Sequence, residues 1–239
     1  MPRGCAPKAP AVAEIALSAP ALLAALRLGS AALPIGAFAY SQGLERAVSL
    51  GYVSDACSAE RWICGMLEHS VLTLDIPMLG ALHAAWLSHD DAEVLRLSGF
   101  LFAMRASQEL RDEERQLGRA LYRLLARLGV ERAEPWLEKE CTTLAAAFAL
   151  SAVSWQVPSD AAALAYCFAW AEAQVGAATR LVPLGQSSAQ AVLSRVLMLA
   201  ADGLPDALLR EETSVTSSTP GQTLLSAAHE TEYCRLFRS

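Results

Sequence analysis

Residues 108–128 read QELRDEERQLGRALYRLLARL, and this stretch decides the fold class. Its leucines recur at the three- and four-residue spacing of one helical face: Leu110, Leu117, Leu121, Leu124 and Leu128. Charges of both signs alternate on the other face, and Arg111 and Glu114 have the spacing of a helical ion pair. We predict one long helix over 99–128, in which the charged run 105–115 is a solvated face rather than an acid–base centre.

Helical patterns also fill the chain on both sides of this stretch. We predict helices over 21–28, 41–50, 58–74, 77–86, 135–157, 160–178, 187–201, 205–211 and 224–233, with a short one capped by Asp90 or Asp91. Neither an alternating strand pattern nor a fixed-period repeat is found. The sequence therefore predicts an all-α protein, a single-domain helical bundle of about eight to ten helices with no sheet.

The chain is predicted to hold one folded domain between less regular segments. Residues 1–20 contain four prolines and no periodicity, which is typical of a flexible leader. Residues 21–239 form the all-α domain. Within it we expect a polar linker at 213–223, which reads TSVTSSTPGQT, and a C-terminal binding tail at 230–239.

The composition favours a globular protein that does not bind nucleic acid. Of the 239 residues, 54% are hydrophobic and 18% charged, which excludes a mainly disordered chain. The net charge is −6, whereas a nucleic-acid binder needs a basic excess to neutralise phosphates. Arginine supplies 17 of the 19 basic residues, which fits either recognition of carboxylates on a partner or, as the favoured explanation, codon usage.

Cysteine usage and hydropathy indicate a cytoplasmic protein. The six cysteines are scattered, with no CxxC, and so do not form a secreted disulfide framework. The longest uncharged stretch, 141–159, is long enough to raise a membrane span, but it is rich in Ala, Ser and Thr. We favour a buried helix of a soluble protein there.

Catalytic motifs are missing. The P-loop, GxGxxG, GxSxG and HExxH patterns do not occur, and His229-Glu230 is followed by Tyr233 where a zinc protease needs a second histidine. His83 and His89 are poorly spaced for a metal site and are more simply packed or solvated residues. The sequence argues against an enzyme.

Two groups of aromatic and arginine side chains are poor candidates for solvent. They are Phe38 and Tyr40 in a Pro/Gly-punctuated loop, and Leu236 and Phe237 flanked by Arg235 and Arg238. Such clusters are typical of protein-binding hot spots. The equally weighted alternative is that the tail folds back on its own core.

At these positions the chain resembles the UreF family of urease accessory proteins. The resemblance rests on four blocks in order: 33–45 (LPIGAFAYSQGLE), 109–115 (ELRDEER), 181–186 (LVPLGQ) and 229–239 (HETEYCRLFRS). Four correctly spaced blocks are more specific than one motif, and the match covers residues 22–239.

This resemblance implies an all-α homodimer without catalytic activity, which joins UreD (also called UreH) and the GTPase UreG on the urease structural subunits. That assembly carbamylates the active-site lysine and delivers nickel, with GTP hydrolysis on UreG setting the timing. UreF is expected to bridge the other two and to modulate the UreG GTPase. It would bind no cofactor stably, because the partner complex handles nickel and GTP, and neither nucleic acid nor membrane is an expected partner.

The resemblance also implies which residues meet the partners. They are Phe38, Tyr40, Ser41, Gln42, Glu45, Arg180, Gln186, Tyr233, Arg235, Leu236 and Phe237. Phe38 and Arg235 stand at the positions that the resemblance implicates in holding UreG. Family members commonly have Tyr at the position of Phe38 and frequently Lys at the position of Arg180. We expect the N-terminal segment and the tail to become ordered against UreD. The alternative function is a nickel-binding metallochaperone in its own right, while an all-α enzyme and a small membrane protein are weaker rivals.

Overall fold

The described part of the chain, residues 17–238 of a computed structural model, contains ten α-helices and no strand, so the predicted all-α fold is confirmed. The helices are α1 (Ala19–Gly29), α2 (Leu44–Ser49), α3 (Ala56–Met66), α4 (Ile76–Leu87), α5 (Asp91–Met104), α6 (Gln108–Arg127), α7 (Leu144–Ser154), α8 (Ser159–Leu181), α9 (Gln186–Leu208) and α10 (Pro220–His229). Short 3-10 helices occur at Ala37–Ala39, Glu131–Trp136 and Glu212–Ser214, and a π-helix at Leu67–Asp75.

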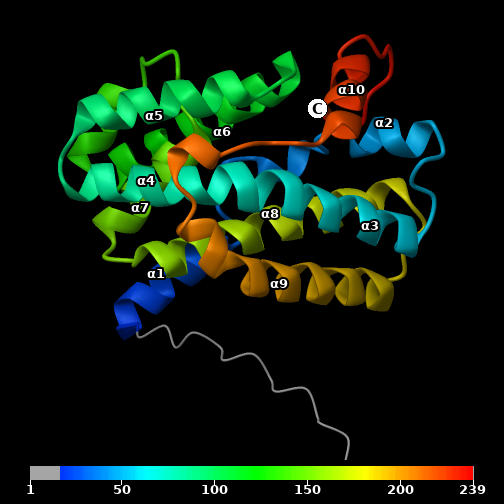
Figure 1. Cartoon of the computed structure of the whole chain (residues 1–239), viewed down its shortest axis with the longest axis horizontal. Coiled ribbons are helices and arrows are strands. Elements are labelled where there is room, and N and C mark those ends of the chain that lie inside the picture. Colours follow the sequence, from blue (N-terminus) through cyan, green and yellow to red (C-terminus); the bar gives the residue numbers. More distant parts are fainter. Residues whose placement is uncertain (1–16, 239) are drawn as a thin grey trace, which may run out of the picture.

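The helices pack as a bundle around α7 and α8 (Figure 1). Helix α8 packs against α1, α4, α7 and α9, while α7 lies between α4 and α6. Alanines 145–147 are fully buried, and such small side chains let the helices approach closely. Trp86 anchors the core: its ring meets that of Trp136 edge-on at 5.0 Å, and its Nε1 donates to the carbonyl of Ala146 at 2.9 Å. At one end of the bundle, α10 packs against α2 and α6.

One continuous helix runs from Ala56 to Leu87, where we predicted a break at Pro77. The prediction was wrong because the π-helix precedes the proline, and the amide of Ile76 bonds to the carbonyl of Val71. Pro77 has no N–H to donate, and the carbonyl of Thr73, four residues earlier, accepts instead from the amide of Thr216 at 3.1 Å. The helix is apolar and long enough to cross a membrane, but 72% of its most apolar window is buried, as in a soluble core. The stretch 141–159 instead holds the short, buried α7.

The predicted helix over 99–128 is two helices. The backbone of Arg105 is extended, and Ser107 caps α6 by accepting from the amide of Leu110 at 3.2 Å. The break turns the Arg105 side chain into the protein. The predicted helix over 135–157 is likewise wrong in its first part, since Thr143 caps α7 only eight residues later.

Other predicted boundaries also shift. Ser18 caps α1, so the predicted leader runs into this helix; its first 16 residues lie outside the described part of the chain. Helix α2 begins after Gly43 rather than at Ser41, and α9 continues through Pro205. Helix α10 begins at Pro220, inside the predicted linker 213–223, which is correspondingly shorter.

Gly118 allows α6 to lie directly on the segment that starts α7. A Cβ at this position would sit 2.7 Å from the carbonyl carbon and oxygen of Thr143, which are backbone atoms and cannot swing away. We expect Gly118→Ala to lower the free energy of unfolding by about 1–3 kcal/mol through overpacking, as measured by urea denaturation. Gly99→Ala is the matched control, because no atom lies within 4 Å of its added Cβ. Equal stability of the two variants would contradict this packing argument.

Candidate functional site

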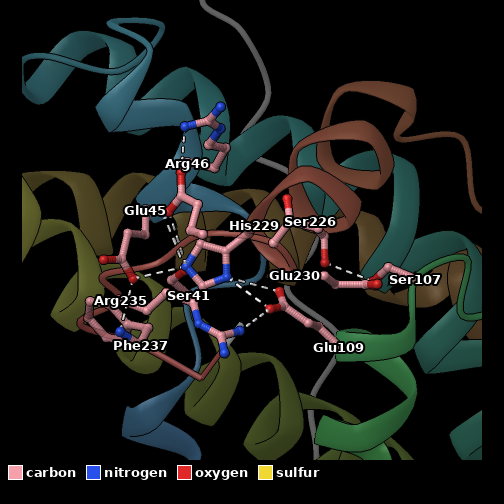
Figure 2. Close-up of polar contacts among 12 residues, drawn as sticks. Ser41, Glu45, Arg46, Ser107, Glu109, Ser226, His229, Glu230, Arg235 and Phe237 are labelled. Carbon is pink, nitrogen blue, oxygen red and sulfur yellow. Dashed lines mark hydrogen bonds and ion pairs between the residues drawn. The ribbon is translucent and has the colours of Figure 1, made fainter.

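The C-terminal tail folds back onto the loop that precedes α2 (Figure 2). Phe237 is buried, and the amide of Arg238 donates to the carbonyl of Ala39 at 2.8 Å. Of the two interpretations of the tail, packing on its own core is the one found for Phe237. We expected the tail to gain its order from UreD, whereas residues 230–238 here make contacts within their own chain.

His229, the last residue of α10, is fully buried between two carboxylates. Its Nδ1 lies 3.0 Å from both carboxylate oxygens of Glu109 on α6, and its Nε2 lies 3.2 Å from Oε2 of Glu45 on α2. A doubly protonated imidazole can donate to both carboxylates at once. The ring therefore ties α10 to α2 and α6.

The same two carboxylates hold the tail. Glu45 accepts from the backbone amides of Leu236 at 2.7 Å and Phe237 at 2.9 Å. Glu109 accepts from Nη1 of Arg235 at 3.0 Å. Each carboxylate thus has one bond to His229 and at least one to the tail, and we call these residues (Glu45, Glu109, His229 and 235–237) the tail clamp.

Small and capping residues bring α10 close to the clamp. Gly43 has φ +86°, and a Cβ there would lie 3.3 Å from the amide nitrogen of Ser226, so only glycine suits both the conformation and the space. The hydroxyls of Ser107 and Ser226 are 2.7 Å apart. Glu230 caps α6 by accepting from the amide of Gln108 at 2.9 Å.

The charged run 105–115 is not the solvated face that we predicted, because three of its carboxylates are buried: Glu109, Glu113 and Glu114. Arg105 turns inward and pairs with both Asp75 and Glu114. Burial alone would lower the pKa of Arg105, but these two carboxylates hold it above its ordinary value. The second oxygen of Glu114 accepts from the amide of Leu144 at 2.8 Å, at the start of α7.

Glu113 lies next to this cluster without a cationic partner of its own. Its Oε1 accepts from the side-chain amide of Gln42 at 2.9 Å, and its Oε2 has no hydrogen-bond partner among residues 17–238. Burial raises the pKa of Glu113 to about 8, and the hydrogen bond from Gln42 offsets only part of that rise. Gln42 also accepts from Nε1 of Trp170 at 3.0 Å, which links α6 to α8.

Above the clamp lies an exposed aromatic and cationic surface. The Phe38 side chain is 63% exposed, and Leu236 is 66% exposed. Arg180 joins the two segments: its Nη1 donates to the carbonyl of Phe38 at 3.1 Å, and its guanidinium lies 5.9 Å from the Phe38 ring centre and 5.8 Å from that of Phe237. We call Phe38, Arg180 and Leu236 the exposed triad.

The remaining predicted partner-binding residues fall into two groups. Ser41 and Tyr40 are buried; the Tyr40 hydroxyl donates to Oε1 of Gln116 at 2.7 Å. Tyr233 and Gln186 are exposed, Tyr233 in the turn after α10 and Gln186 at the start of α9. The buried residues support the surface from beneath.

The sequence analysis missed the central role of His229, which we weighed only as part of an incomplete zinc motif. Its two partners come from blocks far away in sequence, so the one available signal was that all three residues fall within the blocks of the family resemblance.

Within the described chain, no group of three or more His, Cys, Asp or Glu side chains is arranged to hold a metal ion.

Comparison with known proteins gives one consistent result. A profile described as UreF matches residues 53–197. The chain is 42% identical to the urease accessory protein UreF of Alkalilimnicola ehrlichii, over 89% of this chain and 93% of the relative. It is also 42% identical to that of Azoarcus sp. (91% and 95% covered) and 41% identical to that of Cupriavidus necator (91% and 97% covered).

Proposed function

The chain belongs to the UreF family of urease accessory proteins, and from this premise we propose that it is a non-catalytic scaffold that bridges UreD (UreH) and the GTPase UreG on the urease structural subunits. In this role it promotes GTP-dependent nickel insertion and carbamylation of the active-site lysine, and it modulates the GTPase of UreG. Nickel is the cargo of the assembly, and GTP is bound by UreG. The work takes place in the cytoplasm.

The observation that carries this proposal is the exposed triad held in place by the tail clamp. Phe38 exposes its ring next to the Arg180 guanidinium, and Leu236 is exposed on the tail beside Phe237, whose ring Arg180 also faces. Exposed apolar groups with an arginine are the composition of a binding hot spot. The clamp joins α2, α6 and α10 through the half-buried carboxylate of Glu45 and the buried carboxylate of Glu109, so the surface rests on fixed elements. A rigid, pre-formed surface loses less entropy when a partner binds.

A homodimer is the expected state of the scaffold. Helix α1 supports this part of the proposal, since its Leu22, Leu23 and Leu26 are 47%, 67% and 62% exposed. Leu22 and Leu26 line an apolar groove of about 340 Å³ between α1 and α8. A second copy of the chain would cover these leucines.

The test is size-exclusion chromatography with light scattering on the full chain co-expressed with UreD and UreG. We expect the wild type to elute with both partners. Phe38→Ala removes an exposed ring at little cost to folding and is expected to weaken UreG retention about tenfold or more. Deletion of residues 235–239 is expected to abolish it, because the clamp then loses its bonds to Arg235 and to the amides of Leu236 and Phe237.

Leu209→Ala is the matched control, because Leu209 is also an exposed apolar residue, at 81%, but follows α9. It should retain UreG as the wild type does. Circular dichroism of every variant checks the fold. Retention of UreG by the tail-deleted chain would rule out the tail as the binding element, and failure of the wild type to retain either partner would rule out the scaffold.

A further inference from the structure

A cleft of about 700 Å³ opens beside the exposed triad, between the 3-10 helix Ala37–Ala39, α6 and the turn after Trp136. Its basic lining residues are Arg119 and Arg123, one helical turn apart on α6, and Arg238 of the tail. Glu138 is the one acidic residue among those that line it. A protein with a net charge of −6 therefore has a basic cleft at this place.

These guanidiniums have no carboxylate partner within the described chain. Arg119 makes no ion pair or hydrogen bond with its side chain, and its Nε is buried without an acceptor. Arg123 donates from Nε to the carbonyl of Arg119 at 3.2 Å, and Arg238 from Nη1 to Gln116 at 3.1 Å. Most N–H donors of these three guanidinium groups therefore remain available to a ligand. Two parallel N–H donors of one guanidinium can bind the two oxygens of one carboxylate.

Apolar surface separates the charges along the cleft. Ile35, Ala120 and Leu137 line it together with the ring of Phe38, which is itself part of the exposed triad. Arg119 and Arg123 lie in the second half of α6, so the N-terminal amides of α6 are not part of the cleft. A chain with alternating carboxylates and apolar side chains matches this lining.

We propose that this cleft binds an acidic, partly apolar peptide segment of the partner protein that docks on the exposed triad. The inference rests on the proposed scaffold function and names the chemistry of the segment that the scaffold holds. It also gives a structural use to the arginine-rich composition, for which codon usage was the favoured explanation. Arg238 connects the cleft to the tail. Its side chain lines the cleft, and its backbone amide holds the tail by donating to the carbonyl of Ala39.

The first measurement is fluorescence polarisation of a labelled peptide of alternating Glu and Leu, titrated with the full chain. We expect binding that weakens with added salt, and a loss of about tenfold or more in Arg119→Glu/Arg123→Glu. If the double variant fails to fold, Arg123→Glu alone serves as the test, because Arg123 is exposed. We expect this single change to weaken peptide binding less than the double change does. Arg61→Glu/Arg195→Glu makes the same charge change at two exposed arginines elsewhere and should bind as the wild type does.

Equal binding by the wild type and Arg123→Glu would overturn the proposal. Displacement of the peptide by inorganic phosphate, at concentrations where sodium chloride of equal ionic strength has no effect, would also overturn it in favour of a phosphate site. Co-elution with UreD and UreG separates the two proposals. If the wild type retains its partners and Arg123→Glu or the double variant does so equally, the cleft is not used; if the wild type retains none, the scaffold fails whatever the peptide does.

Discussion

Asp75→Ala is expected to lower the free energy of unfolding by about 3 kcal/mol, because it leaves buried N–H donors of the Arg105 guanidinium without an acceptor. Asp75 is 3% exposed and pairs with Arg105, which also pairs with the buried Glu114. The Tyr166 hydroxyl donates to the same Asp75 carboxylate at 3.4 Å and would lose that acceptor. Arg105 keeps Glu114 as its counter-charge, so the expected loss comes from unpaired buried donors rather than from an unpaired cation.

Urea denaturation followed by circular dichroism measures this loss. Asp91→Ala is the matched control, because Asp91 also pairs with an arginine, Arg132 at 2.8 Å, but its side chain is 65% exposed. An exposed pair contributes about 0–1 kcal/mol. A cost for Asp75→Ala no larger than that of the control would show that the Arg105 cluster does not stabilise the fold.

Glu113→Gln is expected to stabilise the protein at alkaline pH, by an amount that grows as the pH rises. The folded protein raises the pKa of Glu113 from 4.5 to about 8, so the folded state holds a proton that the unfolded state releases. The wild type therefore loses free energy of unfolding as the pH rises from about 4.5 to about 8, and the full loss is on the order of 5 kcal/mol. Glutamine cannot ionise and avoids this loss, and its carbonyl can still accept from Gln42.

The measurement is the free energy of unfolding of both proteins between pH 5 and pH 9. Glu93→Gln is the control: its hydrogen bond with Arg96 lowers the pKa of Glu93, so any effect has the opposite sign, and its exposure keeps that effect small. A constant difference between Glu113→Gln and the wild type across this range would show that Glu113 does not titrate as its burial requires.

The sequence predicted helices where side-chain spacing alone decides them. Of the leucines predicted to share one face of the helix, Leu110, Leu117 and Leu121 are buried as that pattern requires. Leu124 is half-buried and Leu128 is 46% exposed, because the face turns toward Leu125 near the end of α6. Breaks were harder to predict. The turn at 105–107 carries no glycine or proline, and Pro77 suggests an end where the π-helix allows the chain to continue. Ser107 is a local cap that starts α6, whereas at Pro77 the π-helix lets one helix continue.

The site was less predictable for a different reason. Alternating charges spaced three and four residues apart are the pattern of a solvated helix, yet Glu109 and Glu113 are each 7% exposed. Their partners are His229, 120 residues away, and Gln42, 71 residues away, and spacing within one helix cannot reveal such contacts. The family resemblance marked the right segments, while the structure shows which side chains within them meet.

The tail clamp has a consequence for the order in which the protein is made. Glu45 and Glu109 leave the ribosome before His229, which is 184 and 120 residues further along the chain. Until then both carboxylates lack the ring that they share in the folded protein, and the segment after α10 that closes over them does not yet exist. An unfinished chain therefore lacks Leu236 of the exposed triad, and under the proposed function we expect only completed molecules to compete for the partners.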